Sequence, residues 1–164
     1  MRTQDGAKIE VIPVVYKAGA YGDFMWMRKQ PGYENAYFVF NDNEEQFLAH
    51  EKDPESAAGC AAGGGNAAIR PWRCEKPPRA GGVPTGVSGH GYQALTPEVR
   101  AIIDRAVARI KSDVTHYNFS RVFYSCRKGD DGACAEDGDL GTGIFNVDKE
   151  VRGYIVSKLK SIGD

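Results

Sequence analysis

The sequence has no long hydrophobic run, no excess of either charge sign and only three histidines. Nowhere do about 18 consecutive apolar residues occur, and the opening MRTQDGAKIE has no apolar signal-peptide core, so we expect a cytoplasmic protein that does not enter a membrane. Lys and Arg number 21 against 22 Asp and Glu, which gives no general attraction to nucleic acid polymers or anionic lipid. Any polyanion bound by this chain is expected to be small and held locally.

Several signatures of known chemistry are also missing. Neither Cys60 and Cys74 nor Cys126 and Cys134 have the close C-x-x-C spacing of a zinc clamp, so we predict free thiols and no metal. The Walker spacing and the complete G-x-G-x-x-G fingerprint are absent, which disfavours a kinase or a Rossmann dehydrogenase. We expect no cofactor.

Alternating strand and helix patterns fill most of the chain and fit a single domain over residues 1–164. They predict an α/β fold with a mixed or mostly parallel central sheet and helices on its faces. Asn43, with Gln46 three residues later, and Thr96, with Pro97, mark helix starts. The predicted elements are strands at 8–16, 35–40 and 120–126 and helices beginning near residues 44, 97 and 147.

Glycine is the one residue in excess, at 20 residues, and much of it gathers in a Gly/Pro-rich segment at about 57–94. This segment shows no clear period, and we expect a long binding loop with a short strand near 68–72. Arg70, Arg73 and Arg79 in it could pair with phosphates or keep the segment soluble.

Polar or glycine-rich residues follow three of the predicted strands. Such segments converge on the carboxyl edge of a parallel sheet, where glycines allow close approach and free N–H groups favour phosphate. Taken alone, the Gly141-Thr142-Gly143 run is more typical of a tight turn, and the Gly63-Gly64-Gly65 run of a hinge. The segments concerned are Gly22-Asp23, Asn41-Asp42-Asn43 and Gly141-Thr142-Gly143-Ile144-Phe145, to which the loop segment Gly63-Gly64-Gly65-Asn66 is added.

Taken together and in order, these segments resemble the macro domain, the ADP-ribose-binding fold. The resemblance implies that Asp23 contacts adenine and that two glycine-rich loops hold the phosphates. It also implies hydrolysis of an ADP-ribosyl or ADP-ribose-phosphate linkage by water activated at Asn41, Asp42 or Asn43. With Arg70 added from the arginines of the Gly/Pro-rich segment, the expected ligand-binding residues are Asp23, Gly63, Gly64, Gly65, Asn66, Arg70, Gly141, Thr142, Gly143, Ile144 and Phe145.

The family's Asn-Ala-Ala-Asn segment is absent, and Glu44 and Glu45 follow Asn43 directly. His90, in a glycine-flanked loop, is the histidine best placed to reach a ligand. An alternative is therefore a non-catalytic protein that sequesters a cyclic ADP-ribose isomer or a cyclic oligonucleotide, as a virus facing nucleotide-based immunity could use. A third alternative is a glycine-rich surface for a protein partner. The pattern leaves the oligomeric state open.

Overall fold

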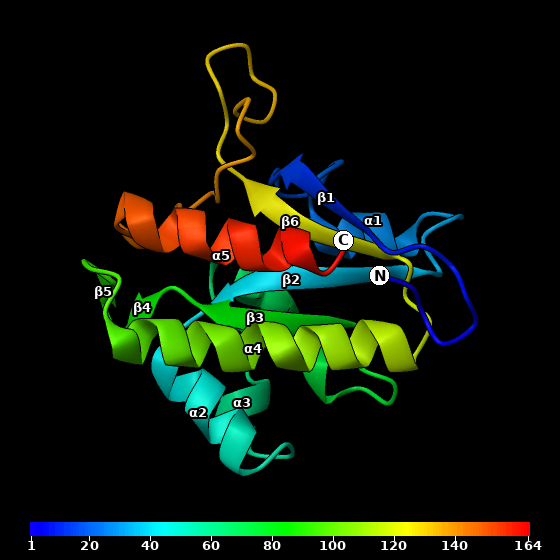
Figure 1. Ribbon diagram of the computed structural model, residues 1–164, viewed down its shortest axis with the longest axis horizontal. Helices are drawn as coiled ribbons and strands as arrows, with labels where there is room; N and C mark the ends of the chain where they lie inside the picture. Colours follow the sequence, from blue (N-terminus) through cyan, green and yellow to red (C-terminus); the bar gives the residue numbers. More distant parts are fainter.

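A computed structural model describes all 164 residues and has a four-stranded parallel sheet at its centre (Figure 1). The strand order is β1-β6-β2-β3, so the two strands that come first along the chain are separated by the last. A short antiparallel hairpin, β4 with β5, stands apart from the sheet. The elements are β1 (Glu10–Val15), α1 (Phe24–Lys29), β2 (Ala36–Asp42), α2 (Glu44–Lys52), α3 (Ala57–Cys60), the 3₁₀ helix η1 (Gly65–Cys74), β3 (Ala80–Pro84), β4 (Gly86–Val87), β5 (His90–Gly91), α4 (Pro97–His116), β6 (Arg121–Cys126) and α5 (Lys149–Ser161).

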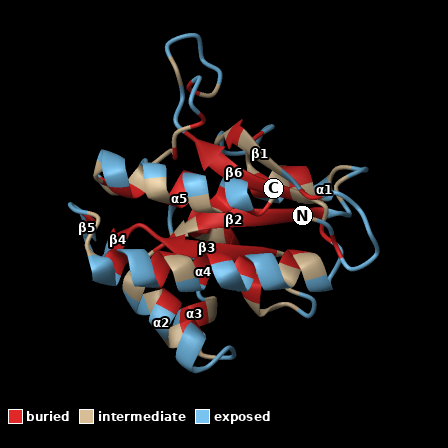
Figure 2. Cartoon of the chain, in the orientation of Figure 1, coloured by how far each residue is buried: buried red, intermediate tan, exposed pale blue.

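The sheet is buried on both faces, as Figure 2 shows for β2, β3 and β6. Alternate side chains of β2 enter different cores because successive residues of a strand point to opposite faces. Tyr37 and Val39 pack in the core under α4 and α5, whereas Phe38 and Phe40 pack in the core with α1 and η1. The predicted α/β class with helices on the faces of a parallel sheet is confirmed. None of the helices combines the length and apolar composition that crossing a membrane requires.

Local signals placed the regular elements well. Asn43 accepts a hydrogen bond from the Gln46 N–H at 2.9 Å and Thr96 accepts one from the Val99 N–H at 3.1 Å, so both are the predicted N-caps. Helix α1 was not predicted, because a helix of six residues is too short to show a clear period.

The Gly/Pro-rich segment is largely structured, and the strand expected near 68–72 is wrong. Those residues lie in η1, where Pro71 sits inside the helix. A 3₁₀ helix repeats every three residues, which places Arg70 and Arg73 on one side, and both contact Asp42. Pairing of the two buried arginines with Asp42 outweighs the β propensity of the short apolar run at 68–72.

Strand β3 could not be recognised in the sequence AGGVP, whose glycines are required by close packing. A Cβ at Gly81 would lie 2.4 Å from the Tyr37 hydroxyl, and one at Gly82 would lie 2.6 Å from the Phe40 ring. Val83 is therefore the only residue of the strand with the β-branched or aromatic side chain that predicts one.

All four cysteines are paired, so the prediction of free thiols is wrong. Cys60 bonds to Cys74 and Cys126 bonds to Cys134, with Cα separations of 6.0 Å and 5.6 Å, and no cysteine is free. The spacing excluded a zinc clamp but said nothing about pairing, because turns in the chain bring the partners together. One disulfide ties α3 to the end of η1, and the other closes the projecting loop after β6 (Figure 1).

Candidate functional site

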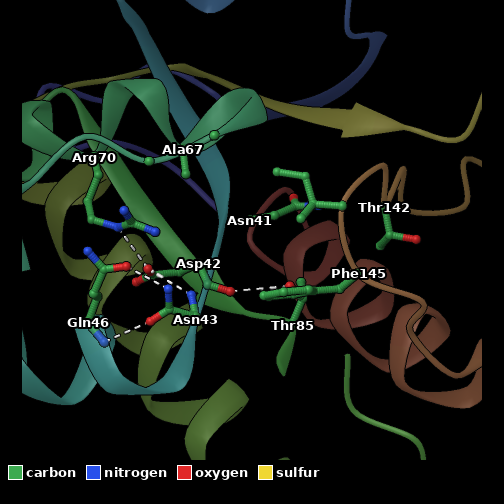
Figure 3. A pocket seen from close by; sticks show the side chains of 12 residues that line it. Asn41, Asp42, Asn43, Gln46, Ala67, Arg70, Thr85, Thr142 and Phe145 are labelled. Carbon is green, nitrogen blue, oxygen red and sulfur yellow. Dashed lines mark hydrogen bonds and ion pairs between the residues drawn. The ribbon is translucent and has the colours of Figure 1, made fainter. Parts of the chain in front are cut away.

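The carboxyl ends of β1, β2 and β6 open into a cleft with two connected parts. A wide pocket of about 450 Å³ lies over the ends of β1 and β6, and a narrow pocket of about 110 Å³ lies over the end of β2. Figure 3 shows the narrow pocket between η1, the start of α2 and the loop after residue 140. The residues that line both pockets are Asn41, Gly64, Thr142 and Ile144.

A network of hydrogen-bonded polar side chains fixes the floor of this cleft. The buried Asn66 accepts from the Asn41 N–H at 2.9 Å and donates to the Ser125 hydroxyl at 2.8 Å. Asn41 in turn donates through its side-chain amide to the Gly141 carbonyl at 2.7 Å. These bonds join β2, η1, β6 and the last glycine-rich loop, so the walls of the cleft are positioned by one hydrogen-bonded unit.

Two glycine-rich loops face each other across the cleft with unused backbone donors. The N–H groups of Gly64, Gly65, Thr142 and Gly143 donate no hydrogen bond within the protein. Ile144 bridges the loops, since its Cδ1 atom lies 3.1 Å from the position of a Cβ on Gly64, while the rest of its side chain is largely exposed. Unpaired N–H groups in such concave loops favour an anion.

A buried ion cluster forms one wall of the narrow pocket. Asp42 pairs through one carboxylate oxygen with Arg70 Nε at 3.0 Å and through the other with Arg73 Nη1. Both guanidinium groups lie near the face of the Phe40 ring, 5.7 Å and 5.3 Å from its centroid. Burial lowers the pKa of Arg73, and Asp42 opposes that shift. Asp42 thus holds two cations in place, and neither of its oxygens is free to activate water.

The neighbouring carboxylates turn away from the narrow pocket. Glu44 accepts from the Tyr92 hydroxyl at 3.0 Å, and Glu45 accepts from the Ser88 N–H at 2.8 Å. Burial, together with the bond to Glu44, raises the pKa of the Tyr92 hydroxyl. The two acids therefore anchor the β4-β5 hairpin and leave the cleft without a repelling charge.

Two predicted site residues lie outside the cleft. Asp23 is the N-cap of α1, accepting from the Met25 N–H at 2.9 Å and the Gly19 N–H at 2.6 Å. His90 is exposed on β5 and lines neither pocket. Asn43, although it lines the narrow pocket, uses its side chain to cap α2.

The structure brings all the other predicted residues together at this cleft. Gly63, Arg70 and Phe145 line the narrow pocket, and Gly65 and Asn66 line the wide one. Most of the residues that escaped prediction lie at or just after strand ends, where neither glycine nor a motif marks them, and two lie in α2 and η1. The lining residues not predicted are Val15, Tyr16, Gln46, Ala67, Thr85, Ser125, Cys126, Arg127 and Lys128.

Comparisons of the chain with protein family models, with curated proteins and with solved structures found no match. The macro-domain resemblance accordingly stays a prediction from the residues that carry it. Function has to be inferred from the cleft itself.

Proposed function

We propose that the cleft binds an ADP-ribose-type nucleotide through its two glycine-rich loops. The observation that carries this proposal is the set of unpaired N–H groups at Gly64, Gly65, Thr142 and Gly143, four residues that line one space from two loops. A pyrophosphate offers oxygens in both directions and would accept from both loops at once. The resemblance of the same segments to a macro domain supports the same ligand class.

The size and lining of the two pockets support a ligand with unlike ends. The wide pocket, at about 450 Å³, lies within the range of roughly 300–1,000 Å³ typical of small-molecule sites. Tyr16 lines it and could stack with a base, while the Thr142 hydroxyl, which has no partner in the protein, could donate to a phosphate. The far end of the ligand would then enter the narrow pocket.

A second candidate, sequestration without turnover, is favoured by how the proposed catalytic side chains are used. Asp42 is paired with two arginines, Asn43 caps α2, and His90 lies outside the cleft. A general base needs a free oxygen or nitrogen within reach of the water that it activates. We therefore propose that the ligand, a linear ADP-ribose derivative or a cyclic nucleotide, is released intact.

Calorimetric titration with ADP-ribose and with a cyclic ADP-ribose isomer, followed by chromatography of the mixture, tests both candidates. Binding with recovery of intact ligand supports sequestration, and cleavage would assign the hydrolase. No heat with either ligand would overturn the ADP-ribose proposal and would leave a cyclic oligonucleotide or a protein partner. The control is the Thr142→Val, Gly143→Val double variant, which should keep its fold and lose binding.

The two disulfides bear on where the protein works. Disulfides persist in oxidising compartments and are rare in a reducing cytoplasm, so they weigh against the cytoplasmic location expected from the sequence. The cytoplasmic location stays a prediction. Thiol labelling of protein taken directly from its source cells would decide, because labelling of all four cysteines would mean that the bonds are absent there.

A further inference from the structure

The buried ion cluster beside the narrow pocket carries an excess positive charge. Asp42, Arg70 and Arg73 are 1 %, 3 % and 6 % exposed, and the cluster holds two guanidinium groups against a single carboxylate. Burying a charge is costly unless a partner compensates for it. One of the two cations is thus compensated only in part by the protein.

The cluster has one guanidinium nitrogen without a hydrogen-bond partner, and it belongs to Arg70. Arg73 uses all three of its nitrogens, on the Gly59 carbonyl, Asp42 and the Gln46 carbonyl. Arg70 donates through Nε to Asp42 and through Nη1 to the Ala61 carbonyl, and its Nη2 has no partner in the protein. Arg70 lines the narrow pocket and Arg73 does not, and Figure 3 shows the Arg70 guanidinium at the pocket's edge.

The rest of the pocket suits an oxyanion. The Thr142 hydroxyl and the Gly64 N–H, both without partners, line the same space. Both oxygens of Asp42 are engaged, so no free carboxylate faces the space. At about 110 Å³ the pocket is far smaller than the roughly 300–1,000 Å³ of a whole ligand site, so it has room for a single group.

We propose that the narrow pocket is an oxyanion site for a phosphate-like group, which accepts from Arg70 Nη2. Charge-assisted hydrogen bonds of this kind are short and strong, and a bound anion would supply the charge that the cluster lacks. The site does not depend on the nucleotide proposal, because inorganic phosphate alone would occupy it. A nucleotide could bind without using it, and the site could bind phosphate although no nucleotide binds.

The test compares two lysine variants with the unmodified protein. Arg70→Lys and Arg73→Lys both keep a charge beside Asp42, but only Arg70→Lys removes a donor that faces the pocket. In calorimetric titrations with inorganic phosphate, Arg70→Lys should weaken binding by about tenfold or more, whereas Arg73→Lys should weaken it only slightly. Thermal unfolding of each variant checks that the fold is kept. Equal losses in the two variants, or no binding by the unmodified protein, would overturn the proposal.

A second measurement needs no variant and covers the case in which Arg70→Lys fails to fold. Inorganic phosphate is titrated into ¹⁵N-labelled protein while the backbone amide signals and the side-chain Nε–H signals of the arginines are followed by NMR. The Arg70 signal should move and saturate. Shifts confined to residues 141–143 would place the phosphate in the wide pocket and contradict the assignment.

Repeating the titration with ADP-ribose bound separates a free ion from a phosphate group of a larger ligand. Phosphate that still moves the Arg70 signal binds beside the nucleotide as a separate ion. Phosphate that is excluded, with the Arg70 signal already at its saturated position, means that the nucleotide's own pyrophosphate fills the site. Both results require an anion-responsive Arg70, and an Arg70 signal that responds to neither ligand would overturn the proposal.

Discussion

The two glycine-rich loops that face each other across the cleft are built very differently. The first, Gly63–Gly65, lies against the buried Arg70 and is preceded by a helix that a disulfide ties to η1. The second is held at Gly141, which donates to the Ser125 carbonyl, and at Asn146, whose carbonyl accepts from the Gln93 side chain, while the backbone donors of residues 142–145 are unpaired. One wall is thus fixed by the core along its length, while the other is held only at its ends and offers its donors to the ligand.

Breaking the cluster beneath the first loop should have the largest effect. Asp42→Ala leaves two buried guanidinium groups facing each other, so the free energy of unfolding should fall by about 3–5 kcal/mol. Urea denaturation measures this loss. The matched control is Glu51→Gln, which breaks the half-exposed pair with Arg105 and should cost about 0–1 kcal/mol. Similar losses in both variants would mean that the cluster does not support the wall.

Removing the Cys60–Cys74 disulfide should destabilise the first wall, which Gly63–Gly65 form, by less than breaking the ion cluster does. The Cys60→Ser, Cys74→Ser double variant frees a loop of 14 residues, and its free energy of unfolding should fall by about 3 kcal/mol. The matched Cys126→Ser, Cys134→Ser variant frees a loop of 8 residues and should lose less. A larger loss of unfolding free energy on removing the Cys126–Cys134 bond would mean that the projecting loop after β6 contributes more to stability than the first wall does.

Acid should weaken the first wall through His50, which is buried in α2 and packs under Gly59. Burial, with help from Arg73 and Arg109, lowers the pKa of His50 from 6.5 to about 4. Because the unfolded chain takes up the proton first, stability is complete above pH 6.5 and falls as the pH drops toward 4, by on the order of 2–3 kcal/mol.

Denaturation at pH 7 and at pH 4.5 measures this fall, and His50→Phe, which fills the same space without a titrating group, should show a shallower dependence on pH. An unchanged slope would assign the acid sensitivity to other groups.

A pair of alanine variants probes the second loop. A Cβ on Gly141 would lie 2.5 Å from the Cys126 carbonyl oxygen, whereas one on Gly143 would meet nothing within 4 Å. Gly141→Ala should therefore destabilise the protein by about 1–3 kcal/mol, and Gly143→Ala should leave stability nearly unchanged. Chemical denaturation of the two variants side by side tests this difference. Equal stability of the two variants would show that the backbone adjusts to a Cβ at Gly141 as easily as at Gly143.

The parts predicted correctly from the sequence have local causes or follow from a general property of parallel sheets. The caps at Asn43 and Thr96 and the apolar strands follow from short-range chemistry. The meeting of two glycine-rich loops follows from the parallel arrangement, which brings strand ends to one edge of the sheet. Strand β3 and η1 could not be predicted, because Gly81 and Gly82 are required by Tyr37 and Phe40 from another strand, and Arg70 by Asp42. The roles given to Asp23 and His90 depended on a cap and on a hairpin position that only the folded chain reveals.

The central claim is that a nucleotide binds between the two glycine-rich loops, and backbone amide NMR tests it most directly. ADP-ribose is titrated into ¹⁵N-labelled protein, and the amide signals of every residue are compared. We expect the largest shifts at Gly64, Gly65, Thr142 and Gly143, because their N–H groups have no partner in the protein. Shifts that leave these four signals unchanged, or that gather at another surface, would contradict the account.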